Sequence, residues 1–80
     1  MDKIEILKKV NNIFIDILDD EAIVLTFDTT ANDIDDWDSL NHIQLVVAIE
    51  KYFKIRFASR EIQSWRNVGE IVDAVSSKLN

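Results

Sequence analysis

The chain has 80 residues, no cysteine and a formal net charge of −6, and these features exclude several classes of protein. A single domain of this length buries only about 60–65% of the surface that its unfolded chain exposes, which leaves no room for a deep, multi-residue active site. The missing cysteines exclude disulfide frameworks and a thiol nucleophile of the protein's own, and the negative charge disfavours nucleic acid, because phosphate binding needs clustered Lys and Arg.

Other absences narrow the range of functions further. The longest apolar run is Leu45 to Ile49, whereas a membrane span needs about 20 residues. The N-terminus has acidic residues and no signal-peptide pattern. A single His, His42, and a single Gly, Gly69, exclude a multi-histidine metal centre and a Gly-rich phosphate loop. We therefore expect one domain over residues 1–80, a monomer in the cytoplasm with no metal site, whose acidic surface suits basic protein partners.

The first segment predicts a helix from about residue 2 to about residue 18. Asp2 is followed three residues later by Glu5, which is a capping-box-like pair. Apolar residues then recur at helical spacing: Ile4, Leu7, Val10, Phe14, Ile17 and Leu18.

Residues 19–38 break this pattern and predict a long acidic loop. The stretch has eight acids and neither Lys nor Arg. Six apolar side chains could hold it against the core: Ile23, Val24, Leu25, Phe27, Ile34 and Trp37. A loop of about 20 residues is unusual in so small a domain and indicates function.

Helices follow the loop. One is predicted from Ser39 to Tyr52 or Phe53, with its start at Asp38 or Ser39, and Ala58 to Ser64 predicts a short helical turn. Asn67, with Glu70 three residues on, predicts the capping box of a last helix. The chain is therefore predicted to be all-α, with three main helices and one short helix.

The helix that begins near Ser39 is apolar on two sides. A helical wheel gives one apolar face for the core, composed of Leu45, Val46, Ile49, Tyr52 and Phe53. Leu40, Ile43 and Val47 lie roughly opposite. This second face is either a patch for a partner or is covered by the long loop.

The junction Asp38-Ser39-Leu40 allows more than one interpretation. Asp and Ser are favoured as helix caps. A triad of Asp35 or Asp38 with Ser39 and His42 is a weak alternative, because no oxyanion-hole loop is visible. The wheel places His42 on the core-facing side near Ser39, which predicts a packed or rim residue and not a base.

A calcium loop that opens with Asp33-Ile34-Asp35 is excluded on two counts. Its sixth position holds Asp38 where Gly is needed, and its twelfth holds Gln44 where a bidentate Glu is needed.

Residues 33–50, Asp-Ile-Asp-Asp-Trp-Asp-Ser-Leu-Asn-His-Ile-Gln-Leu-Val-Val-Ala-Ile-Glu, resemble the core signature of acyl carrier proteins. That signature has Asp-Ser-Leu at the start of a helix that continues with Val, Leu and Glu and ends near a Phe, here Phe53. The run Ile62 to Val72 is similar to the segment that joins the third and fourth helices of the family. The resemblance covers essentially the whole chain.

The resemblance implies a four-helix bundle that is not itself an enzyme. It implies that Ser39 is esterified with 4'-phosphopantetheine from coenzyme A by a magnesium-dependent phosphopantetheinyl transferase. The arm ends in a thiol that holds acyl groups as thioesters for acyl-loading and acyl-processing enzymes. A phosphodiester on Ser39 would lie near the positive end of the helix dipole.

The resemblance also assigns residues to a partner surface and to an acyl pocket. Positions presented to partner enzymes are Asp38, Leu40, Ile43, Val47 and Glu50. Positions that line the acyl-chain pocket are Leu45, Val46, Ile49 and Phe53.

Departures from the family pattern concern the pathway. Carriers of fatty acid synthesis usually have acids where this chain has Asn41, Gln44 and Lys51, and a small residue where it has Trp37. The sequence looks more like a stand-alone carrier of polyketide, lipid or surface-polysaccharide modification. Two alternatives stay open, a carrier of amino acids or peptides and an unmodified acidic helical adaptor that binds a basic protein.

Overall fold

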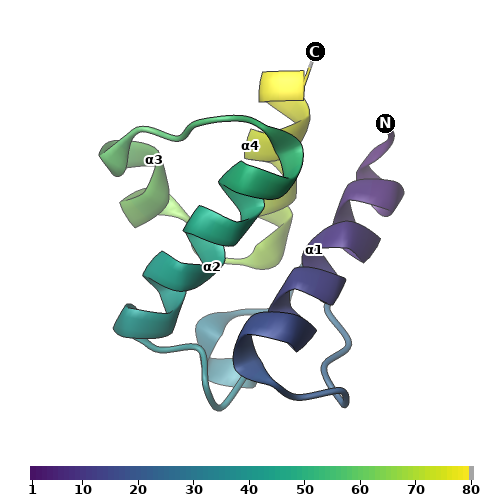
Figure 1. Ribbon diagram of the computed structural model, residues 1–80, viewed down its shortest axis with the longest axis vertical. Helices are drawn as coiled ribbons and strands as arrows, with labels where there is room; N and C mark the ends of the chain where they lie inside the picture. The colour runs from purple at the N-terminus through teal and green to yellow at the C-terminus, as the bar shows by residue number, and fades with distance from the viewer. Residues whose placement is uncertain (80) are drawn as a thin grey trace.

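The computed structural model describes residues 1–79 and contains four α-helices and one short 3₁₀ turn. In chain order the elements are α1 (Lys3–Leu18), η1 (Ala31–Asp33), α2 (Ser39–Phe53), α3 (Ser59–Ser64) and α4 (Val68–Leu79). Helices α2 and α4 both pack against α1 and run antiparallel to it, and α3 lies beside α2 on the side away from α1 (Figure 1). The prediction of an all-α bundle with three main helices and one short helix is confirmed. Within residues 1–79, no helix combines the length and the apolarity that crossing a membrane requires.

The helix starts follow the predicted caps. The Asp2 carboxylate accepts the N–H of Glu5 at 2.8 Å, and the Asp38 carboxylate accepts the N–H of Asn41 at 2.8 Å. Helix α2 therefore has Asp38 as its N-cap, which makes Ser39 its first helical residue.

The predicted capping box of α4 is only half correct. The Asn67 side chain accepts the N–H of Glu70 at 2.9 Å, as expected. The Glu70 carboxylate, however, accepts the N–H of Arg66 and not that of the cap residue. Both bonds still pair backbone donors at the start of the helix.

The core-facing side of α1 differs in part from the predicted one. Five side chains of α1 are buried: Ile6, Val10, Ile13, Phe14 and Leu18. Ile4 is 61% exposed, so its assignment to the apolar face was wrong, and Ile6 takes the equivalent place at the start of the helix. Apolar residues occur on several sides of this helix, and spacing alone does not select among them.

The long segment between α1 and α2 is held to the core by alternate residues. Ile23 and Leu25 are buried, whereas Val24 between them is 79% exposed and Phe27 is 39% exposed. The prediction that Val24 and Phe27 hold the loop was therefore wrong. Successive side chains of an extended chain point to opposite sides, so Val24 faces away when its neighbours face the core.

Hydrogen bonds hold the segment between α1 and α2 at two places, one against α1 and one against α4. The Asn11 side chain on α1 accepts the N–H of Leu25 at 2.6 Å and donates to the carbonyl of Ile23 at 3.3 Å. Further along, the carbonyl of Phe27 accepts the N–H of Gly69 at 2.8 Å. The segment thus spans the space between α1 and the first turn of α4.

Candidate functional site

Ser39 lies at the junction between the acidic segment and α2, and its side chain is exposed. The Asp38 carboxylate performs the helix capping, so capping explains the Asp but not the Ser of the Asp-Ser-Leu sequence. The Ser39 hydroxyl therefore stands at the start of a 15-residue helix without serving as its cap.

The acidic segment is bonded to the first turn of α2. The Asn41 side-chain amide donates to the carbonyl of Asp36 at 2.8 Å, while its backbone N–H donates to Asp38. Asn41 is half-buried as a result. Sequence reasoning treated Asn41 only as a neutral residue at a partner-facing position and missed this bond. A polar side chain three residues after the Asp38 cap was the one available signal.

His42 packs inside the site and does not face Ser39 as a base. Its Nδ1 accepts the indole N–H of Trp37 at 3.0 Å, and its Nε2 lies 3.4 Å from the carbonyl of Ile62. Because Nδ1 accepts, we assign the ring proton to Nε2, where it points at that carbonyl. Both ring nitrogens are thus used in the fold, as the prediction of a packed histidine requires, and the triad with Ser39 is not assembled.

A row of aromatic rings fixes Trp37 and His42 in place. The ring of Phe14 on α1 lies edge-on to Trp37 with centroids 4.9 Å apart. On the other side, Trp65 lies 6.1 Å from His42 and 4.8 Å from Phe57. Edge-to-face pairs at such separations are favourable. The row connects α1, the end of the acidic segment, α2 and the chain on both sides of α3.

A groove of about 280 Å³ opens beside Ser39, between the first turns of α2 and the short helix α3. Its lining combines apolar side chains with hydroxyl and amide groups: Ser39, His42, Ile43, Ser59, Ile62 and Gln63. An extended polar chain that is attached to Ser39 could lie along this groove.

The second face of α2 is open. Leu40, Ile43 and Val47 are 71%, 55% and 43% exposed. The alternative in which the acidic segment folds over them is therefore wrong. We call these three residues the α2 stripe.

The two acids assigned to the partner surface differ in their surroundings. Asp38 is exposed, although one of its oxygens caps α2. Glu50 is half-buried, and its Oε2 accepts the N–H of Phe57 at 2.9 Å. Glu50 therefore also holds the chain that leaves α2.

Residues 1–79 contain no cluster of three or more His, Cys, Asp or Glu side chains that could hold a metal ion. Glu61 on α3 has a pKa below its usual value. The backbone N–H of Ala58 and the ammonium of Lys78 both bond to its carboxylate, and they lower the pKa of Glu61. Glu61 joins α3 to α4 and bears on the stability of the fold.

Comparison with known proteins identifies the kind of site that this is. A family model described as the phosphopantetheine attachment site matches residues 8–75. An acyl carrier protein of Petrotoga mobilis (strain DSM 10674 / SJ95) is 32% identical over 80 residues, which is 100% of this chain and 94% of that protein. The chain belongs to the acyl carrier protein family.

A solved structure agrees with this assignment. The solution structure of a holo acyl carrier protein from Geobacter metallireducens superposes with a TM-score of 0.86. The two sequences are 49% identical, and the match covers 91% of this chain and 84% of the Geobacter metallireducens chain. The resemblance found in the sequence is thus confirmed, and with it the carrier function, the absence of catalysis by the chain itself and the use of 4'-phosphopantetheine. Partners of such a carrier include a phosphopantetheinyl transferase and acyl-processing enzymes.

The residues around Ser39 fit this prosthetic group. The hydroxyl is exposed, a different residue caps the helix, and the neighbouring groove offers both apolar and polar walls. When bound, the group supplies the thiol that the 80-residue chain lacks.

The residues assigned to the acyl pocket all lie in the core of the carrier. Leu45, Val46, Ile49 and Phe53 are at most 8% exposed and pack with residues of α1 and α4. Tyr52, which was predicted on the same face, is 51% exposed, so that prediction was wrong. Its ring lies edge-on to that of Phe53, with centroids 4.9 Å apart.

Proposed function

We propose that Ser39 is the residue that carries the 4'-phosphopantetheine arm. The observation that supports this most directly is the exposed Ser39 side chain at the first residue of α2, next to an Asp that already caps the helix. The phosphodiester would then lie at a helix N-terminus, where the dipole and unpaired N–H groups favour an anion.

Ser59 provides a matched control for this assignment. It is also exposed, is also the first residue of a helix and lines the same groove as Ser39. It lacks the preceding Asp cap, because Ala58 occupies that position.

The experiment compares the wild type with Ser39→Ala and Ser59→Ala after incubation with coenzyme A, magnesium and a broad-specificity transferase. Intact mass should show one added phosphopantetheine on the wild type and on Ser59→Ala, and none on Ser39→Ala. Circular dichroism should show that all three are equally helical. An adduct on Ser39→Ala, or no adduct on the wild type, would contradict the assignment.

We further propose that partner enzymes dock on the α2 stripe, with Asp38 and Glu50 at its borders. The exposed apolar side chains supply affinity, and the border charges select the partner. Ile43→Ala should lower the efficiency with which a transferase uses the protein, whereas Val24→Ala, which also removes an exposed apolar side chain, should not. Equal effects of the two substitutions would argue against a specific surface.

We propose that the acyl chain binds against Leu45, Val46, Ile49 and Phe53. These side chains are at most 8% exposed, so the core must open to admit the chain. Amide chemical shifts of these residues should change between the holo and acylated forms, while those of the exposed end of α1 stay the same.

We also propose that the protein works as a monomer in the cytoplasm, where coenzyme A is available, in a specialised pathway with dedicated enzymes. Neutral Gln44 and basic Lys51 support this proposal, because both are exposed on α2 where carriers of fatty acid synthesis usually have acids.

A further inference from the structure

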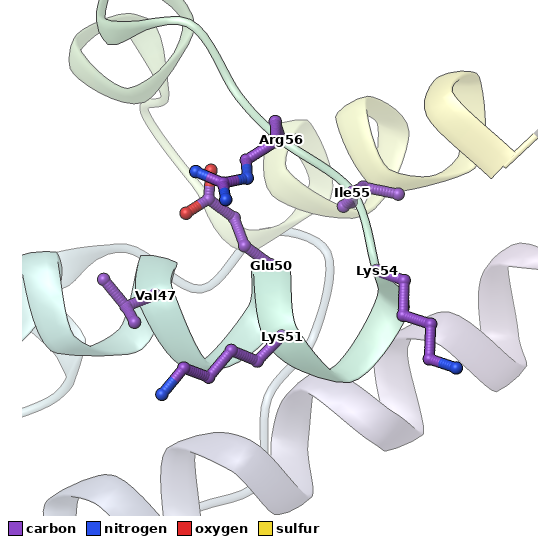
Figure 2. Close-up of a pocket in the computed structure, with 6 residues that line it drawn as sticks. All are labelled: Val47, Glu50, Lys51, Lys54, Ile55 and Arg56. Atoms are coloured by element: carbon purple, nitrogen blue, oxygen red, sulfur yellow. The ribbon is translucent and has the colours of Figure 1, made fainter.

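A basic groove of about 540 Å³ lies at the C-terminal end of α2, away from Ser39 (Figure 2). It is lined by side chains of the last turns of α2 and of the chain that follows: Val47, Glu50, Lys51, Lys54, Ile55 and Arg56. Three of the nine Lys and Arg residues of an acidic chain therefore line one groove.

Within residues 1–79, neither Lys51 nor Lys54 forms a salt bridge. The salt bridges found in residues 1–79 use other cations, Lys3 with Asp73 and Lys78 with Glu61. Lys51 and Lys54 are exposed, and Figure 2 shows their ammonium groups pointing away from the Glu50 carboxylate.

The one acid of the groove is already engaged. Glu50 Oε2 accepts the backbone N–H of Phe57 at 2.9 Å, and the Arg56 guanidinium points toward the same carboxylate (Figure 2). Lys51 and Lys54 are thus the charges that a molecule approaching from outside would meet.

The groove is continuous with the proposed docking surface. Val47 belongs both to the α2 stripe and to the groove lining. At 1.5 Å per residue, Lys51 lies about 18 Å along the helix axis from Ser39. The opposite end of α2 follows Asp35, Asp36 and Asp38, so the two ends of the stripe have opposite charge.

We propose that the partner enzymes of this carrier present an acidic segment to Lys51 and Lys54 in this groove, while the arm enters their active site from the other end of α2. This inference rests on the proposed docking along α2. Opposite charges on the two surfaces steer the encounter and fix its orientation. A protein segment fits better than nucleic acid or an anionic membrane, because the net charge of −6 repels extended polyanions from the rest of the surface.

The test is an NMR titration of the ¹⁵N-labelled holo protein with an octaglutamate peptide. Shift changes should be largest for the amides of Lys51, Lys54 and Ile55. Lys51→Gln combined with Lys54→Gln should weaken binding about 2- to 30-fold, as expected for two exposed ion pairs. The control combines Lys8→Gln with Arg66→Gln, which removes two exposed cations elsewhere and should leave the affinity unchanged.

Three outcomes would overturn the inference. The first is no binding, and the second is an equal loss of affinity in the control variant, which would indicate a general charge effect. The third is tighter binding at the same amides by a single-stranded oligonucleotide or by phosphatidylglycerol vesicles, which would assign the groove to another class of partner. The mass experiment tests whether the arm is attached to Ser39. Titration of the unmodified Ser39→Ala protein with octaglutamate tests the groove alone, so the two proposals can fail independently.

Discussion

The indole N–H of Trp37 donates to Nδ1 of His42 across 3.0 Å, and the two rings are stacked with centroids 6.0 Å apart. These residues stand on either side of Ser39 in the chain, one at the end of the acidic segment and one in the first turn of α2. Their contact fixes the position of Ser39 by joining its two flanks. A residue that could be taken for a general base thus has a positioning function.

Loss of this bond should destabilise the protein. Trp37→Phe keeps an aromatic ring but leaves Nδ1 of half-buried His42 without its donor, at a cost of about 1–3 kcal/mol. Urea unfolding measures the loss. Trp65→Phe removes the same atoms from another ring of the row, between His42 and Phe57, without breaking this bond. Equal losses in both variants would show that ring volume alone matters.

Asn11→Leu should release the segment between α1 and α2. The substitution keeps approximately the same size but removes both bonds to the backbone of Ile23 and Leu25, and we expect a loss of about 1–3 kcal/mol. Asn12→Leu changes the exposed neighbour and is the control. Hydrogen exchange should accelerate at the Leu25 amide in the first variant only. Retained protection at that amide would contradict the role of Asn11.

Gly69→Ala should destabilise α4 although alanine favours helices. A Cβ at this position would lie 2.8 Å from the carbonyl oxygen of Phe27, a backbone atom that cannot rotate away. The intrinsic gain of up to about 1 kcal/mol is therefore outweighed by strain of about 1–3 kcal/mol. The melting temperature measures the balance, with Ser77→Ala in the same helix as control. A more stable Gly69→Ala protein would mean that the segment can move aside at little cost.

The pKa of Glu61 gives a pH-dependent prediction. Bonds from the Ala58 N–H and from Lys78 lower this pKa, so the folded state favours the carboxylate. The stabilisation is present above the ordinary glutamate pKa of about 4.3 and is lost as the pH falls through the lower, folded-state value.

Glu61→Gln should therefore melt at a slightly lower temperature than the wild type at neutral pH. This difference should close as the solution is acidified below the ordinary glutamate pKa. Glu21→Gln, which alters an exposed acid outside the helices, should differ little at any pH. A difference for Glu61→Gln that persists at low pH would mean that packing, not charge, explains it.

Charge on α2 should determine which enzymes accept the carrier. Gln44→Glu combined with Lys51→Glu should improve use by a ketoacyl synthase of fatty acid synthesis about 2- to 30-fold, if each position contributes as an exposed ion pair. Asn41 is left unchanged, because its amide bonds to the carbonyl of Asp36. Lys8→Glu combined with Asn12→Asp changes the net charge by the same three units at exposed positions of α1 and is the control. Efficient and equal use of the wild type and the variant would remove the support for a specialised pathway.

Local patterns in the sequence were enough for the helices and for the position of Ser39 at the start of α2. The starts of the helices follow from Asp2, Asp38 and Asn67, because a cap bonds to N–H groups within three residues. That Leu40, Ile43 and Val47 share one face of α2 follows from the helical repeat, whereas their exposure is known only from the structure.

The remaining contacts depend on residues far apart in the chain. The Asn11 side chain bonds to residues 12 and 14 positions away, and His42 approaches a carbonyl 20 positions away. No repeat or cap encodes such pairs. The exposure of Ile4 and Tyr52 was missed for a related reason, since a helical wheel shows which side is apolar but not how far a neighbouring helix extends along it.

The placement of charge along α2 has a consequence for how such a carrier can evolve. Asp38 at the N-terminus and Lys51 in the last turn are each favourable to the helix dipole, by about 0.3–1 kcal/mol. A domain of this size has a total stability of only about 4–12 kcal/mol. Mutations that reverse the charge of Asp38 or Lys51 to suit a different partner enzyme therefore weaken the helix that presents Ser39. A lineage that changes partners in this way must first acquire compensating stability elsewhere in the chain.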